Sequence, residues 1–227
     1  MTFDPLARPP LFTADLPGVG GRIKVQTEDF EVEEIPPYPP SGAGEFLYLW
    51  IEKRDMGAEY FVRQVARRLD VPVGEVGTAG LKDRRAVTRQ MVSVPARAEG
   101  RLPQLGGDGV RLLSVSRHGN KLKPGHLHGN RFRILIRDAD PTAAERLAPI
   151  LEQLRHRGLP NSYGPQRFGR DGETVLLGLA MLRKEPTPGR VNPFLRKLAL
   201  SAAQAALFNH ALACLLYTSD AADDLTR

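Results

Sequence analysis

The sequence has few of the residues that form disulfides or bind metals, and few long apolar segments that would insert into a membrane. It has one cysteine, Cys214, which excludes an internal disulfide, and its five histidines lack the spacing of a metal site. No apolar run is long enough to span a membrane, and the N-terminus lacks the basic and apolar regions of a signal peptide. We therefore expect a monomeric, cytoplasmic protein with no metal, no cofactor and no membrane partner.

The rest of the composition is that of a globular protein with a basic excess. The 227 residues are 41% hydrophobic, which is enough to bury one substantial core and to begin a second domain. Lysine and arginine number 32 against 26 acidic residues, which gives a net charge of +6 and a pI near 9.7. This excess favours a polyanionic partner such as RNA, although a solvated surface explains the same balance.

The spacing of apolar residues predicts strands followed by helices. An amphipathic helix is expected over residues 58–69. Strands are expected within residues 24–35, 45–53, 74–80, 91–95, 110–116 and 130–138, and the second of these is apolar on both faces, as a central strand would be. Further helices are expected over residues 140–158, broken or kinked at Pro149, over residues 174–184, and over residues 192–212. This order indicates an α+β body followed by a helical unit.

Residues 117–131, RHGNKLKPGHLHGNR, are rich in basic residues and histidine and contain no acid. Because aromatic residues are also scarce there, we expect the segment to hold RNA by charge on its phosphates rather than by stacking bases. Lys121, Lys123 and Arg131 are the predicted contacts to the RNA backbone.

Four separated stretches carry a family resemblance. They read TEDFEVEEIPPYPPSGAGEFLYLWIEKR, VGTAGLKDRRAVTRQMVSV, RHGNKLKPGHLHGNRF and LPNSYGPQRFGRDG, and a fifth, LALSAAQAALFNHALA, lies further on. In order and spacing they resemble the TruD family of tRNA pseudouridine synthases, over roughly residues 22–213. Ser162 and Tyr163 depart from the aromatic pair that the family commonly has there.

The resemblance implies a fold and an activity. The fold is α+β, a pseudouridine-synthase-like, mixed and mostly antiparallel sheet with flanking helices, forming a catalytic domain over residues 1–157. The start of a helical TRUD insertion domain follows over residues 158–213. The implied activity is the isomerisation of uridine to pseudouridine in tRNA, at position 13 by family analogy, without a cofactor.

Two other functions fit parts of the sequence. A non-catalytic RNA-binding module would explain the basic segment equally well, but not the family's pocket residues. A small-molecule enzyme with a phosphate-binding glycine turn is disfavoured, because GTAGLKD lacks the spacing of a nucleotide loop.

Asp83, in GLKDRRAVTRQ, matches the family's essential aspartate. Pseudouridine formation detaches uracil from ribose, turns it and rejoins it through carbon 5. A carboxylate can act as a nucleophile on the sugar or the ring, or as a base at the ribose. The flanking Lys82 and Arg84 are expected to keep Asp83 ionised. Without the family match, an aspartate after a glycine turn would be read as a solvated turn residue.

Five further residues are expected at the substrate. Asn130 offers a donor and an acceptor that match the edge of uracil, and Phe132 offers a ring on which an extruded base can stack. Phe30 resembles a substrate-contacting phenylalanine of the family, with Lys24 near it and Lys82 beside Asp83. By residue type alone, the phenylalanines would belong to the core and the lysines to the solvated surface.

The last residues, CLLYTSDAADDLTR, change character abruptly. The segment from Cys214 to Asp223 can be encoded by a transposon-adapter sequence used in DNA library preparation. We therefore expect residues 214–227 to be a non-native, adapter-derived tail, and the catalytic domain to lack its C-terminal return. An ordinary acidic helix end is the alternative. A chain truncated in this way is expected to turn over poorly.

Overall fold

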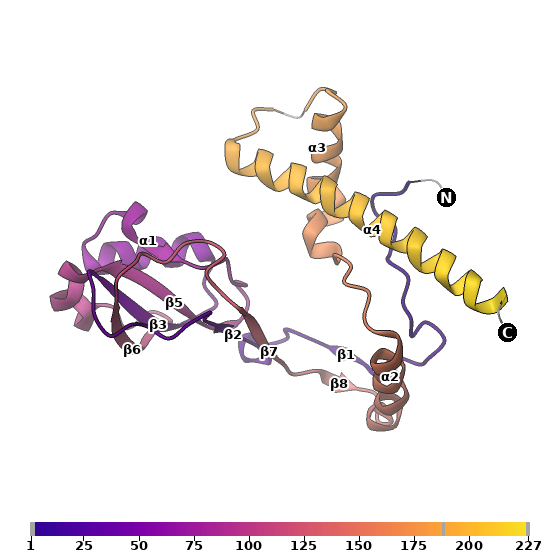
Figure 1. Cartoon of the computed structure of the whole chain (residues 1–227), viewed down its shortest axis with the longest axis horizontal. Helices are drawn as coiled ribbons and strands as arrows, with labels where there is room; N and C mark the ends of the chain where they lie inside the picture. Colours follow the sequence, from indigo (N-terminus) through magenta and orange to yellow (C-terminus); the bar gives the residue numbers. More distant parts are fainter. Residues whose placement is uncertain (1–2, 188, 226–227) are drawn as a thin grey trace. The chain divides into compact units, whose positions relative to one another are not determined.

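The computed structural model describes residues 3–187 and 189–225, with side chains described as far as Tyr217. The chain forms two compact units, Gly20–Pro141 and the combination of Met1–Val19 with Thr142–Arg227 (Figure 1). The predicted domain boundary at residues 157 and 158 rests on the family resemblance and stays a prediction. Most of the predicted foreign tail, residues 218–227, lies outside the described side chains.

The unit Gly20–Pro141 is built on a mixed sheet with the strand order β6-β3-β5-β2-β7, with β4 paired to β5. Its strands are β2 (Phe30–Ile35), β3 (Phe46–Arg54), β4 (Gly77–Thr78), β5 (Val87–Pro95), β6 (Val110–His118) and β7 (Gly129–Ile134). Strands β2 and β5 run parallel, and the other described pairs are antiparallel. The predicted mixed, mostly antiparallel sheet is therefore confirmed, with β3 in the interior.

One face of this sheet is covered in part by α1 (Ala58–Leu69), the helix predicted at the same residues (Figure 1). Leu47, Leu49 and Ile51 of β3 pack there in one cluster with Phe61 and Val65 of the helix, and all five are fully buried. Each such side chain contributes about 1.5–3 kcal/mol on burial, so this cluster is the main core of the unit. Three 3₁₀ helices complete the unit, η1 (Thr27–Asp29), η2 (Val73–Glu75) and η3 (Ala96–Gln104).

The predicted strand over residues 130–138 is wrong in one respect, because two strands form. Strand β7 ends at Ile134 after pairing with β2, and β8 (Arg137–Ala139) pairs instead with β1 (Gly20–Arg22). The Arg137 guanidinium binds the buried Asp29 carboxylate at 2.8 Å and holds the pKa of that carboxyl below its ordinary value. The strand is interrupted because the chain leaves β2 and pairs with β1 instead, and the alternation of apolar and polar residues cannot reveal such a change.

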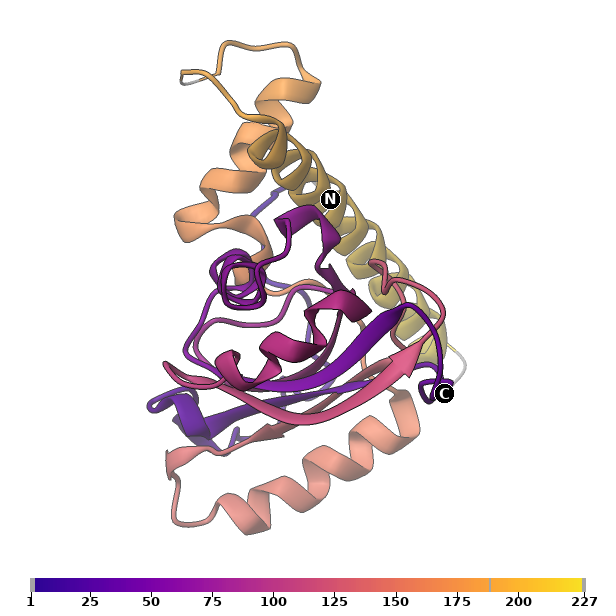
Figure 2. The same ribbon diagram turned by 90° about the vertical axis from the view of Figure 1, so that its left-hand side faces the viewer.

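The second unit is helical, with α2 (Ala143–Arg157), α3 (Glu173–Leu182), α4 (Pro193–Leu225) and the short 3₁₀ helices η4 (Pro165–Phe168) and η5 (Arg170–Gly172). In both ribbon views α3 lies beside the first half of α4 (Figures 1 and 2). Val175 packs in one cluster with the buried Ala202 and Ala203 of α4. A Cβ added at Gly178 would lie 2.0 Å from the Ala199 carbonyl oxygen, so only glycine permits this close approach.

Two features of these helices bear on the predictions. The predicted break at Pro149 is wrong, because α2 continues through this residue although proline has no amide N–H to donate within the helix. Residues Pro193–Tyr217 of α4 are long and apolar enough to cross a membrane, with a mean hydropathy of 1.4. One face of this helix packs its alanines against α3, and 33% of the apolar window is buried. The predicted absence of a membrane partner stays a prediction.

Candidate active site

Asp83 lies in the loop between β4 and β5, and its carboxylate faces a lysine from a distant part of the chain. The Lys24 ammonium donates to Asp83 Oδ1 at 3.0 Å. The two side chains are 25% and 27% exposed, so the pair is sheltered but can be reached from solvent. The prediction assigned the neighbouring charge to Lys82 and Arg84, whereas Lys24 supplies it and Arg84 lies 3.9 Å from Asp55.

Two phenylalanines stand beside this ion pair. The Lys24 ammonium is 3.8 Å from the centroid of the Phe30 ring, a cation–π contact. The rings of Phe30 and Phe132 have centroids 5.9 Å apart at an angle of 57°. Phe30 is buried, while Phe132 is 53% exposed and presents its ring to solvent. The structure therefore brings together four of the predicted residues, Lys24, Phe30, Asp83 and Phe132.

The backbone at Lys24 is strained. Its φ of 56° lies in the left-handed region, which costs a residue with a Cβ roughly 1–2 kcal/mol. Such strain persists where the surrounding structure fixes it and is concentrated at functional sites. Here it accompanies the contacts of Lys24 with Asp83 and Phe30.

Asn130 is two residues before Phe132 on β7, so both side chains face the same side of the sheet. Its Oδ1 atom is buried and has no hydrogen-bond partner among the described residues. A buried acceptor left unpaired costs roughly 1–3 kcal/mol. A donor from a bound ligand would recover that free energy.

Lys82 is buried rather than open to the site. Its ammonium donates to Glu34 Oε2 at 2.6 Å, and the two side chains are 3% and 1% exposed. The other oxygen of Glu34 accepts from the Met91 amide at 3.2 Å. The pair fastens the loop that carries Asp83 to strands β2 and β5, and it leaves the Lys82 ammonium away from the surface where a substrate contact was predicted.

A second buried lysine touches the same loop, and sequence reasoning missed it. Lys53 is fully buried on β3, and its ammonium donates to the backbone carbonyls of Asp83 at 2.9 Å and Met56 at 2.6 Å. Burial lowers the pKa of Lys53 to about 8, while the negative charge of Asp83 acts in the opposite direction.

The period of two along the strands could have revealed both buried charges. Lys53 has the same parity as Leu47, Leu49 and Ile51, the core face of β3. In the same way, Glu34 has the parity of the buried Phe30 and Val32 on β2. A charge in phase with an apolar face needs a specific partner, and this is the signal that points to such residues.

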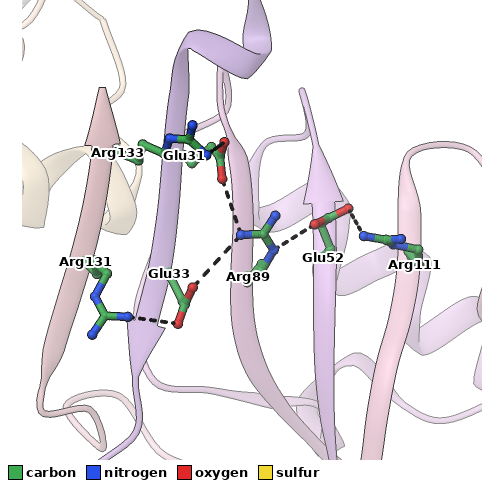
Figure 3. Close-up of polar contacts among 7 residues, drawn as sticks. All are labelled: Glu31, Glu33, Glu52, Arg89, Arg111, Arg131 and Arg133. Carbon is green, nitrogen blue, oxygen red and sulfur yellow. Dashed lines mark hydrogen bonds and ion pairs between the residues drawn. The ribbon is translucent and has the colours of Figure 1, made fainter. Parts of the chain in front are cut away.

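The opposite face of the sheet carries an ion-pair ladder across five strands (Figure 3). Its members are Glu31, Glu33, Glu52, Arg89, Arg111, Arg131 and Arg133. At its centre, Arg89 lies 2.8 Å from Glu52 and 3.3 Å from Glu31. Arg131 lies 3.7 Å from Glu33, so this predicted RNA contact points away from the face that holds Asp83.

The predicted basic segment is partly neutralised by other parts of the chain. Arg117 is paired with Glu99, and the Lys121 ammonium donates to the Gly74 carbonyl. Lys123 is exposed. Within residues 3–187 and 189–225, no group of three His, Cys, Asp or Glu side chains could hold a metal, and the predicted absence of a metal stays a prediction.

The comparisons with known proteins fit this geometry. A family model described as tRNA pseudouridine synthase D (TruD) matches residues 9–189. The chain belongs to the TruD family. It is 47% identical over 208 residues to a tRNA pseudouridine synthase D from Anaeromyxobacter sp. strain Fw109-5, and this match covers 90% of the chain and 59% of the relative. The family resemblance seen in the motifs is thus confirmed.

Two further comparisons also identify TruD proteins as similar to this chain. A tRNA pseudouridine synthase D from Thermus thermophilus is 46% identical over 203 residues, covering 89% of the chain and 56% of the relative. A solved TruD structure from Methanosarcina mazei matches with a TM-score of 0.67 and 27% identity, over 85% of this chain and 48% of that one. The α+β fold is confirmed by this likeness. The chain spans a little over half the length of these curated TruD relatives.

Proposed function

We propose that this protein is a tRNA pseudouridine synthase, which isomerises uridine to pseudouridine at position 13 of tRNA by family analogy. The observation that carries the proposal is the Lys24–Asp83 pair beside the Phe30 and Phe132 rings. A single charge would be weak support. Here a carboxylate with a lysine partner, an exposed ring for stacking and an unpaired amide oxygen for hydrogen bonding offer the kinds of contact that a bound nucleobase needs. We assign the chain to the cytoplasm, as a monomer that acts without a metal.

The reaction is an isomerisation, so no co-reactant is required. The bond between ribose carbon 1 and uracil nitrogen 1 breaks, the base turns, and the same ribose carbon joins uracil carbon 5. Carbon 5 then loses its proton and nitrogen 1 gains one, so the product is an isomer of the substrate. The Asp83 carboxylate acts on the ribose or on the ring, and the Lys24 ammonium orients it through the contact at 3.0 Å. The other side chains hold the base while it is detached.

An extruded base needs a stacking surface and a contact at its edge. The exposed ring of Phe132 supplies the surface, with Phe30 behind it. The buried Oδ1 of Asn130 accepts from a uracil N–H, while its amide group donates to a uracil carbonyl. Lys82 serves this site indirectly, because its pair with Glu34 holds the Asp83 loop.

A direct assay tests the proposal. Excess protein is incubated with a tRNA transcript labelled at uridine, and the digested RNA is separated for pseudouridine. We expect a slow conversion that Asp83→Asn abolishes. The matched control is Asp70→Asn, because Asp70 caps α1 with a left-handed φ of 52°, which asparagine also tolerates. Conversion by Asp83→Asn at the wild-type rate would disprove the role of Asp83.

The assay also decides between the enzyme and an RNA-binding module. Tight tRNA binding without any pseudouridine from the wild-type chain would favour the binding module for these 227 residues. We place the RNA backbone near Lys121 and Lys123 on the segment that leads into β7. Arg131 can meet a phosphate only from RNA that reaches the ladder face.

Charge on the phosphates makes the affinity depend on salt. Each lysine that neutralises a phosphate adds about 0.7–0.9 to the slope of log affinity against log salt concentration. We expect the double variant Lys121→Ala with Lys123→Ala to weaken tRNA binding at low salt. It should also reduce this slope by the amount that corresponds to one or two phosphate contacts. Titrations at several salt concentrations measure both quantities. An unchanged slope would remove this segment from the RNA interface.

A further inference from the structure

Lys53 occupies a position where a lysine is unfavourable. The residues of the same parity on β3, Leu47, Leu49 and Ile51, are all fully buried in the core. Lys53 is also fully buried, and no carboxylate lies within ion-pair distance of its ammonium among the described residues. A buried charge without an ionic partner is costly, and an apolar side chain would fit this face at lower cost. The position therefore calls for an explanation beyond packing.

Within the described part of the chain, the hydrogen bonds of the Lys53 ammonium go to two backbone carbonyls. One belongs to Met56, in the turn between β3 and α1, and the other belongs to Asp83 itself. The carboxylate of Asp83 lies on the same residue and is held from the other side by Lys24. The residue that carries the chemistry is thus fixed at its backbone by one lysine and at its side chain by another.

We propose that Lys53 is a positioning residue that fixes the Asp83 backbone, so that the carboxylate keeps its place beside Lys24 and the exposed ring of Phe132. The inference rests on the proposed function for its catalytic consequence. Lys53 does not touch the substrate, because its side chain is fully buried beneath the loop.

Two features of Lys53 suit it to this task. Burial lowers its pKa to about 8, yet a neutral amine still has two N–H donors, one for each carbonyl. The anchor therefore does not depend on the charge. It is also distinct from the Lys82–Glu34 pair, which fastens the side chain of the preceding residue to β2. Adjacent residues of the loop are fixed to two different strands, which leaves the peptide between them little freedom.

The test compares Lys53→Met, which has similar length but no donor, with Lys53→Arg, which keeps donors. Lys197→Met, at an exposed site on α4, is the matched control. In the full chain we expect Lys53→Met to slow single-turnover pseudouridine formation at saturating tRNA by about tenfold or more, the effect of losing the buried hydrogen bond to the Asp83 carbonyl. The tRNA dissociation constant should change less than about twofold, because phosphate and base contacts remain. Lys53→Arg should recover part of the rate.

Amide hydrogen exchange gives a second readout that does not need activity. We expect residues 80–86 to exchange about tenfold faster in Lys53→Met, while the amides of α1 and β5 keep their protection. If Lys53→Met does not fold, Lys53→Gln, a shorter side chain that retains an amide donor, takes its place.

The outcomes separate the two proposals. A wild-type chain that makes no pseudouridine refutes the proposed function, while the exchange of residues 80–86 still decides whether Lys53 holds the loop. Unchanged exchange in this loop overturns the positioning role. An unchanged rate per folded molecule at saturating tRNA, with stability alone reduced, also overturns it and leaves Lys53 a structural residue.

Discussion

The two faces of the sheet in the unit Gly20–Pro141 use charge in opposite ways. On the face that holds Asp83, Lys53 and Lys82 are buried. Lys53 donates to the backbone carbonyl of Asp83, and Lys82 is paired with Glu34. On the other face, seven acidic and basic residues share contacts in the ion-pair ladder (Figure 3). Exposed ion pairs, such as those at the Arg131 and Arg133 end of the ladder, contribute little to stability, whereas breaking a buried pair leaves an uncompensated charge. The same residue types therefore have very different weight on the two faces.

Strand β2 shows this difference between neighbouring residues. Glu33 belongs to the ladder and is 41% exposed, whereas Glu34 is 1% exposed and paired with Lys82. The two differ only in the face to which the strand directs them. A substitution at one position should consequently tell nothing about the other, and each face offers predictions of its own.

The largest effect on stability is expected on the buried side. Glu34→Gln leaves the Lys82 ammonium buried without its acid, and we expect the free energy of unfolding to fall by about 3–5 kcal/mol. Denaturant unfolding measures this loss. The combined variant Glu34→Leu with Lys82→Met removes both charges and should be considerably more stable than Glu34→Gln. If the double variant is the less stable one, the pair is not an isolated buried charge pair and the comparison between the faces fails.

A smaller effect, on binding rather than on stability, is expected at Phe132. Since its ring is half exposed, Phe132→Ala should leave the melting temperature nearly unchanged while tRNA binding loses about 1–3 kcal/mol of stacking. Ile134→Ala is the matched control, because Ile134 is on the same face of β7 and similarly exposed. Equal losses from both substitutions would assign Phe132 to a general apolar surface and not to the base.

Much of the fold could be predicted because its patterns are local. The spacing of apolar residues located α1 at its observed bounds, and the apolar patterns located β2 to β7 approximately. The short strand β1 was not predicted, and β2 begins at Phe30 rather than at Lys24. The break after Ile134 could not be predicted, since it arises when the chain exchanges β2 for β1 as its partner. Alternation also places Arg131 and Phe132 on opposite faces, so the separation of Arg131 from the site could have been read from the sequence.

Family motifs identified residues of the site, but sequence patterns could not identify the contacts between them. Asp83, Phe30 and Phe132 follow from motifs, and the structure brings them together with Lys24. Lys53 lies within the first of the resembling stretches, but nothing there links it to Asp83, because their contact joins residues thirty positions apart. Such contacts depend on strand order, which sequence patterns leave open.

The smallest effect is expected at the edge of the ladder. Arg133 is 84% exposed and lies 3.6 Å from Glu31, so Arg133→Ala should lower the free energy of unfolding by about 0.5 kcal/mol or less. Because the Arg133 guanidinium is open to solvent, added salt should reduce what remains of the difference. Urea unfolding of both proteins at low and high salt measures the two quantities, and Glu31→Ala completes a double-mutant cycle. A coupling energy above about 2 kcal/mol would show that the ladder acts as a cooperative network, in which Arg89 transmits the loss at Arg133 to Glu52. In that case exposure alone would not separate the two faces, and the ladder would have to be counted among the interactions that hold β2 and β5 in register beneath the site.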